Sequence, residues 1–108
     1  MAGPALDSSI FFPLFSDAEV SEQFSDPQFV RAMLDVESAL ATVQGQLGVI
    51  PAEAADQIVD AASRLEVDFD RLRIGVEKSG VPVIDLVHQL REKVGGQSAD
   101  YIHWGATS

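Results

Sequence analysis

A stripe of apolar residues spaced alternately four and three positions apart constrains the fold of this chain most strongly. This spacing is that of one face of a continuous α-helix. The stripe consists of Phe29, Met33, Val36, Leu40, Val43 and Leu47. The sequence therefore predicts a long helix from about Asp26 to Leu47.

Local signals at both ends support this helix. Ser25 and Gln28 have the spacing of a capping box, and Gly48 suits the position just after a helix. The apolar face is wider than one short neighbouring helix would cover. We therefore expect it to pack against helices outside this chain, with Met33, Val36 and Leu40 buried in the assembled protein.

Further helices are indicated by capping, proline and glycine signals. Ser16 and Glu19 form a capping box for a short helix over 17–24. Pro51 suits the first turn of the next helix, and a third helix is expected to end at Gly80. The last predicted helix starts at Pro82 and stops at Gly95 and Gly96. No segment alternates with period two, so the fold class is all-α, a single helical domain of about four to five helices.

Composition excludes several classes of protein. The net charge is −10, from 7 basic and 17 acidic residues, and the bases are scattered. Nucleic acid is therefore not an expected partner, because phosphate contacts need clustered Lys and Arg. The absence of cysteine excludes disulfides and thiolate chemistry and is compatible with the cytoplasm, where we expect the protein to be. The N-terminus has neither a signal peptide nor a membrane span.

The segment "HWGATS" holds the strongest candidates for a functional site. Gly105 allows a sharp turn, after which His103, Thr107 and Ser108 can point at one small volume. Hydroxyls donate hydrogen bonds to carboxylates, and a histidine adds charge or transfers a proton. On spacing alone, the simpler interpretation is that Thr107 or Ser108 caps a following helix.

The other ionisable residues give weaker indications. His88 is expected to be a partly exposed helix residue, with Asp85 close enough to pair with it. His88 and His103 lack the spacing of metal ligands, so we expect no metal site. Asp35 and Glu37 are interpreted as part of a solvated polar face of the long helix.

Three segments resemble a known family. "MLDVESALA", "SGVPVIDLVHQL" and "YIHWGATS" are similar to the first long helix and the first signature region of the fumarase/aspartase superfamily. Within that superfamily they most resemble the 3-carboxy-cis,cis-muconate cycloisomerases. The resemblance extends from about Phe11 to Ser108.

The resemblance implies an all-helical homotetramer whose active sites take residues from three subunits. It also implies a reaction without cofactors, in which 3-carboxymuconate is closed to 4-carboxymuconolactone in protocatechuate (β-ketoadipate pathway) degradation. Carried over by position, His103, Thr107 and Ser108 would bind substrate carboxylates, and His103 is the one candidate catalytic residue. The Gly105–Ala106 backbone would shape their loop.

The chain also departs from the family pattern. Val81 stands where adenylosuccinate lyases have a histidine, which argues against that enzyme. The superfamily's mobile loop, with the presumed general base, is missing. We therefore expect the N-terminal domain of a longer enzyme, inactive alone. The alternatives are another lyase that releases fumarate, or a helical interaction module without enzymatic activity.

Overall fold

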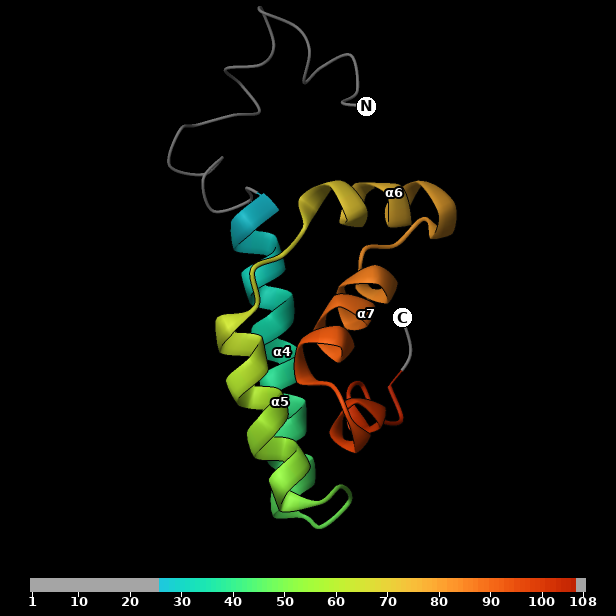
Figure 1. The fold of residues 1–108 in the computed structure, drawn as a ribbon. Helices are drawn as coiled ribbons and strands as arrows, with labels where there is room; N and C mark the ends of the chain where they lie inside the picture. Colours follow the sequence, from blue (N-terminus) through green and yellow to red (C-terminus); the bar gives the residue numbers. More distant parts are fainter. Residues whose placement is uncertain (1–25, 107–108) are drawn as a thin grey trace, which may run out of the picture. The chain divides into compact units, whose positions relative to one another are not determined.

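The computed structural model describes residues 26–106, and in this range the chain is helical, with no strand (Figure 1). The helices are α4 (Asp26–Gln46), α5 (Ala52–Arg64), α6 (Phe69–Ser79), α7 (Val83–Val94) and the short 3-10 helix η1 (Gln97–Tyr101). The predicted all-α fold is confirmed. The helix expected over 17–24 lies outside the described residues.

The chain divides into two compact units, Met1–Ala32 and Met33–Ser108. The description of packing that follows concerns the second unit. None of the helices in the described part of the chain is long and apolar enough to cross a membrane.

Glycine and proline set the helix ends where the sequence predicted them. Gly48 and Gly80 adopt left-handed backbone conformations, with φ of 73° and 80°. Past the end of α4, the backbone N–H of Val49 donates to the carbonyl of Gln44 at 2.9 Å, which satisfies a terminal carbonyl. Pro51 and Pro82 each immediately precede the first residue of a helix.

The core of the second unit lies where α5 packs against α7 and η1, and where α7 packs against α6 (Figure 1). Small side chains allow a close approach of α4 to α5: a Cβ atom on Gly45 would lie 2.6 Å from the Cβ of Ala55. The buried apolar residues of this unit are Leu34, Ala41, Ile50, Ala54, Ala55, Ile58, Ala61, Ala62, Leu72, Leu86, Val87, Leu90 and Ile102.

The predicted apolar stripe of α4 is largely uncovered within this chain. Val36 is 65 % exposed and Leu47 is 73 % exposed, while Met33 and Leu40 are partly buried. The face that turns into the core is the adjacent row, Leu34, Glu37 and Ala41. Burial of the stripe in an assembled protein therefore stays a prediction.

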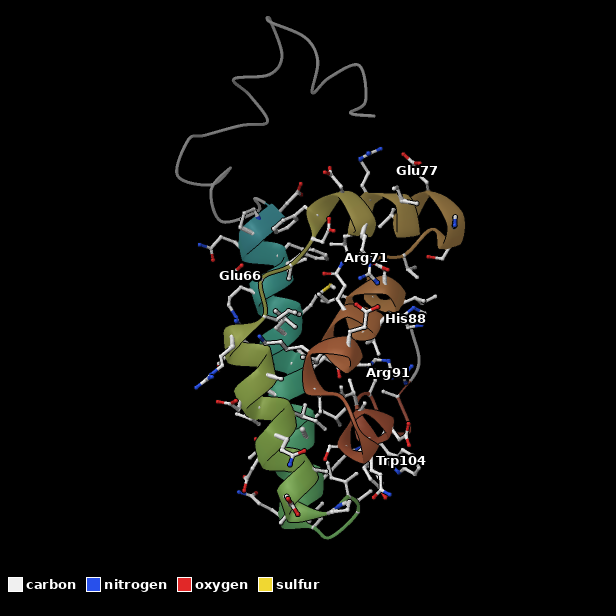
Figure 2. All side chains as sticks on the ribbon, in the orientation of Figure 1. Glu66, Arg71, Glu77, His88, Arg91 and Trp104 are labelled. Atoms are coloured by element: carbon white, nitrogen blue, oxygen red, sulfur yellow. The ribbon has the colours of Figure 1, made fainter. Side chains whose placement is uncertain are left out.

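Side chains join α6 to α7. The buried amide of Gln89 accepts from the backbone N–H of Asp68 at 2.8 Å and donates to its carbonyl at 3.0 Å. Arg71 of α6, labelled in Figure 2, donates to both carboxylate oxygens of Glu92 on α7. This contact raises the pKa of Arg71 and lowers the pKa of Glu92.

Candidate functional site

The loop after η1 carries the part of "HWGATS" that the structure describes. Its first residue, Ile102, is 1 % exposed and anchors the loop in the core. His103 follows with φ of 60°, a left-handed conformation that is uncommon for residues other than glycine. The N–H of Ala106 donates to the carbonyl of His103 at 3.1 Å and closes a turn over Gly105, whose φ is 73°. The turn predicted at Gly105 is therefore present.

His103 forms a buried pair with a carboxylate of α4. Its Nδ1 atom lies 2.5 Å from Oε1 of Glu37, and the side chains are only 18 % and 6 % exposed. The interpretation of Glu37 as part of a solvated face is therefore wrong. That face is polar at Asp35, which is exposed, but Glu37 points inward to the histidine.

One polar atom on each partner of this pair is unused by the described residues. Within 26–106, neither Oε2 of Glu37 nor Nε2 of His103 has a hydrogen-bond partner, and both atoms are buried. Buried polar atoms in proteins are nearly always hydrogen-bonded, so exceptions indicate a special role or a partner not yet in place.

The next residue, Trp104, is held by the same helix. Its backbone carbonyl accepts a hydrogen bond from Nε2 of Gln44 at 2.8 Å. Its ring packs against Tyr101 with the centroids 5.3 Å apart and the planes inclined at 49°. Helix α4 thus fixes the loop at two successive residues.

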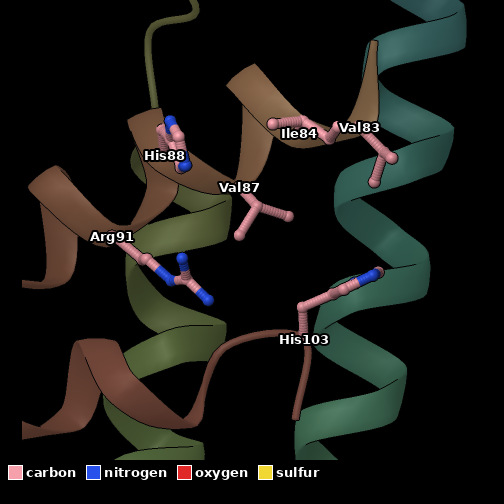
Figure 3. Close-up of a pocket in the computed structure, with 6 residues that line it drawn as sticks. All are labelled: Val83, Ile84, Val87, His88, Arg91 and His103. Carbon is pink, nitrogen blue, oxygen red and sulfur yellow. The ribbon is translucent and has the colours of Figure 1, made fainter. Parts of the chain in front are cut away.

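A shallow hollow of about 140 Å³ lies between α7 and this loop. Figure 3 shows His88 and Arg91 projecting from α7, and His103 across from them with its ring turned toward α4. The remaining lining residues are Val83, Ile84 and Val87. The exposed polar groups on the α7 side of the hollow, His88 and Arg91, are of the kinds that bind anions, on a chain whose net charge is −10.

The predictions for the other ionisable groups have mixed outcomes. His88 is exposed, as expected. Asp85 contacts other groups: it accepts from Nε2 of Gln89 at 2.8 Å and lies 3.7 Å from Arg71. Among residues 26–106 there is no group of three or more histidines and carboxylates that could hold a metal ion.

The substrate-binding roles of the three predicted site residues stay predictions. The structure describes His103, but Thr107 and Ser108 lie outside the described residues. It adds the buried Glu37, whose side chain was expected on a solvated face of α4. The signal that could have found Glu37 is its position in the row Leu34, Glu37 and Ala41, where a carboxylate interrupts apolar residues at helical spacing.

Known proteins similar to this chain were found by sequence and by structure, although no family model matches it. A 3-carboxy-cis,cis-muconate cycloisomerase from Acinetobacter baylyi is 41 % identical over 106 residues, which cover 94 % of this chain and 24 % of the relative. An adenylosuccinate lyase from Methanothermobacter thermautotrophicus is 43 % identical over 79 residues, covering 73 % of this chain and 18 % of the relative. Trans-aconitate decarboxylase 1 from Mycosarcoma maydis is 37 % identical over 95 residues, which cover 88 % of this chain and 19 % of the relative.

Two solved structures share the fold with a TM-score of 0.82 and 39 % identity. One is a fumarate lyase from a Mesorhizobium species, with 87 % of this chain and 22 % of that one covered. The other is a β-carboxy-cis,cis-muconate cycloisomerase from Acinetobacter calcoaceticus, with 92 % of this chain and 24 % of that one covered. The chain thus spans about a quarter of the length of the proteins it matches.

Proposed function

Since this chain belongs to the fumarase/aspartase superfamily by sequence and by fold, we propose that it is the N-terminal domain of a 3-carboxy-cis,cis-muconate cycloisomerase. The observation that carries the proposal is its identity of 36–41 % to cycloisomerases from three bacteria, over 94 % of the chain in each case. Because those relatives are about four times longer, the domain alone is expected to be inactive.

The proposed reaction is an isomerisation that needs no cofactor. A carboxylate oxygen of the substrate adds to a carbon–carbon double bond, and the neighbouring carbon takes up a proton, which yields a lactone. The charge left next to a second carboxylate makes an enolate-like intermediate. Fixed hydrogen-bond donors at that carboxylate stabilise the transition state more than the ground state and therefore raise the rate.

In this proposal, the loop after η1 supplies the donors. Thr107 and Ser108 donate to a substrate carboxylate, and His103 lies beside them. The contacts of Glu37 with His103 and of Gln44 with Trp104 support this proposal, because they hold the start of the loop in one position against α4. The cationic side of the neighbouring hollow, at Arg91, favours an anionic substrate.

A second candidate reaction is the release of fumarate, as in an adenylosuccinate lyase. The 43 % identity to the lyase from Methanothermobacter supports it, although over a shorter span. Val81 argues against it, because adenylosuccinate lyases have a histidine at this position, and valine can neither donate a proton nor bind an anion.

We also propose that the enzyme is a homotetramer, held together by helices outside this chain. The exposed apolar side chains of α4 support this, since an uncovered stripe of this kind is typical of an interface. Sedimentation of the complete enzyme would then give four times the subunit mass. Sedimentation as a monomer would contradict the assembly.

Turnover of two substrates tests the proposed reaction. We expect the complete enzyme that includes this chain to consume 3-carboxy-cis,cis-muconate, with loss of the ultraviolet absorbance of the conjugated diene and no release of fumarate. Cleavage of adenylosuccinate with fumarate as a product would support the second candidate. Turnover of neither substrate would contradict both.

A further inference from the structure

Glu37 and His103 form a hydrogen-bonded pair of ionisable side chains in the interior of the protein, where packing alone would favour apolar residues. It joins residues 66 positions apart in the sequence, with Nδ1 of His103 2.5 Å from Oε1 of Glu37, and both residues follow buried apolar residues of their own segments, Leu34 and Ile102. A buried carboxylate is costly unless a hydrogen-bond donor faces it. In the described part of the chain, the side chain of His103 faces the carboxylate of Glu37.

The backbone of His103 is held in an unusual state at the same point. Its φ of 60° is unfavourable for a residue with a side chain, and the contact of the ring with Glu37 is an interaction that offsets this cost. Histidine adopts this conformation more readily than most residues. The pair therefore fixes both the ring and the start of the loop.

The direction of the hydrogen bond follows from charge. A carboxylate only accepts hydrogen bonds, so the proton between the two groups belongs to Nδ1 of His103. In a neutral imidazole the other nitrogen is then an acceptor, and the contact of one nitrogen decides the state of the other. Nε2 is buried and has no partner within residues 26–106. A bare acceptor there costs less than an unpaired N–H.

We propose that Glu37 is a positioning residue for His103: its carboxylate holds the proton on Nδ1 and leaves Nε2 as the nitrogen available to the reaction. The position of the proton on Nδ1 is inferred from the geometry alone. The use of Nε2 in the reaction rests on the proposed function. Glu37 does not contact substrate in this account. It acts through the orientation and tautomer of His103.

Nitrogen NMR of the chain with labelled histidines tests the protonation state. The chain has two histidines, and the exposed His88 is an internal control. At a pH above the ordinary pKa of histidine, we expect His103 to carry a proton on Nδ1, seen as a one-bond coupling, and none on Nε2, while His88 averages between forms. A His103 protonated on Nε2, with or without a proton on Nδ1, or averaging like His88, would overturn the proposal.

The variant Glu37→Gln keeps the volume and removes the charge. An amide either accepts from or donates to Nδ1, so the fraction of His103 protonated at Nδ1 should fall. Glu66→Gln, an exposed position labelled in Figure 2, is the matched control and should leave the His103 signals unchanged. An unchanged His103 spectrum in a folded Glu37→Gln variant would also contradict the proposal.

Kinetics of the complete enzyme test the catalytic use. Glu37→Gln should lower kcat about 10–100-fold, the range found when the partner that orients a metal-ligating histidine is removed. His103→Asn keeps a side chain that tolerates φ near 60°. If Glu37 acts through His103, the double variant should be no slower than His103→Asn alone. Multiplied losses would show an independent, structural role of Glu37.

A wild-type enzyme that is inactive on 3-carboxymuconate would contradict the proposed function. The NMR result would still decide the protonation state of His103.

Discussion

The side-chain amide of Gln44 donates to the carbonyl of Trp104 at 2.8 Å, across 60 positions of sequence. With the contact of Glu37 to His103, it gives α4 two successive holds on the loop that starts the candidate site. The two helix residues are seven apart, which is two turns on the same face. One face of a single helix therefore sets the course of this loop.

Replacing Gln44 by methionine keeps the length of the side chain and removes the donor. We expect the free energy of unfolding to fall by about 0.5–1.5 kcal/mol, the net contribution of one hydrogen bond. Trp104 is the only tryptophan, so its fluorescence reports on the loop directly. The emission should shift in Gln44→Met and stay unchanged in the control Gln46→Met on the exposed side of α4. Identical emission in both variants would mean that Gln44 does not hold the loop.

Gln89 is expected to be one of the most sensitive polar positions. Leucine has a similar size, but Gln89→Leu leaves the backbone N–H of Asp68 without its partner, while the carbonyl of Asp68 keeps the N–H of Leu72 as a donor. The expected loss is about 1–3 kcal/mol for an unsatisfied group, measured by denaturant unfolding. Gln57→Leu, at an exposed position of α5, is the control and should change stability by less than about 0.5 kcal/mol. Equal effects at both positions would contradict the role assigned to Gln89.

At Gly45, helix propensity and packing predict opposite effects of a substitution by alanine. Alanine is normally favoured over glycine at helical positions, by up to about 1 kcal/mol in the interior, and Gly45 is the next-to-last residue of α4. Here the added Cβ would lie 2.6 Å from the Cβ of Ala55, so α4 and α5 would have to move apart. We expect Gly45→Ala to destabilise the chain by about 1–3 kcal/mol, as overpacking does. A higher melting temperature in this variant would show that the two helices are not in close contact.

The ion pair of Arg71 and Glu92 predicts a dependence of stability on pH. Hydrogen bonding to Arg71 lowers the pKa of Glu92 in the folded state. The pair therefore stabilises the fold above the ordinary pKa of glutamate, about 4.3, and the contribution is lost as the pH falls through the lowered pKa. Both side chains are substantially exposed, so the effect should be small and weakened by salt.

Unfolding of Glu92→Gln at several pH values measures this effect. The difference in stability between wild type and variant should be largest near neutral pH and shrink in acid. Glu66→Gln, at an exposed glutamate outside the helices, is the control. A difference that grows as the pH falls would have the wrong sign for this pair.

The sequence predicted those features of the fold that local chemistry determines. The helix ends at Gly80 and Gly95 follow from backbone preferences that act within a few residues. The orientation of α4 could not be read in the same way. It has two adjacent apolar rows, and which of them faces the core depends on neighbours such as Ala55, far along the chain.

The candidate site also combines features that local sequence determines with features that depend on distant residues. The turn at Gly105 was predicted because glycine permits it locally. The burial of Glu37 was missed because it depends on His103, a residue 66 positions away, and a glutamate next to polar neighbours resembles an ordinary surface residue. Pairing across such a distance leaves no trace in local spacing, apart from the interrupted apolar row.

The central claim is that this loop supplies donors to a substrate carboxylate, and the kcat of Thr107→Val in the complete enzyme tests it most directly. Valine keeps the shape and removes the hydroxyl. If Thr107 donates to developing charge, kcat should fall about 10²–10³-fold with little change in melting temperature. If Thr107 only caps a following helix, the melting temperature should fall instead. A wild-type kcat in this variant would contradict the account.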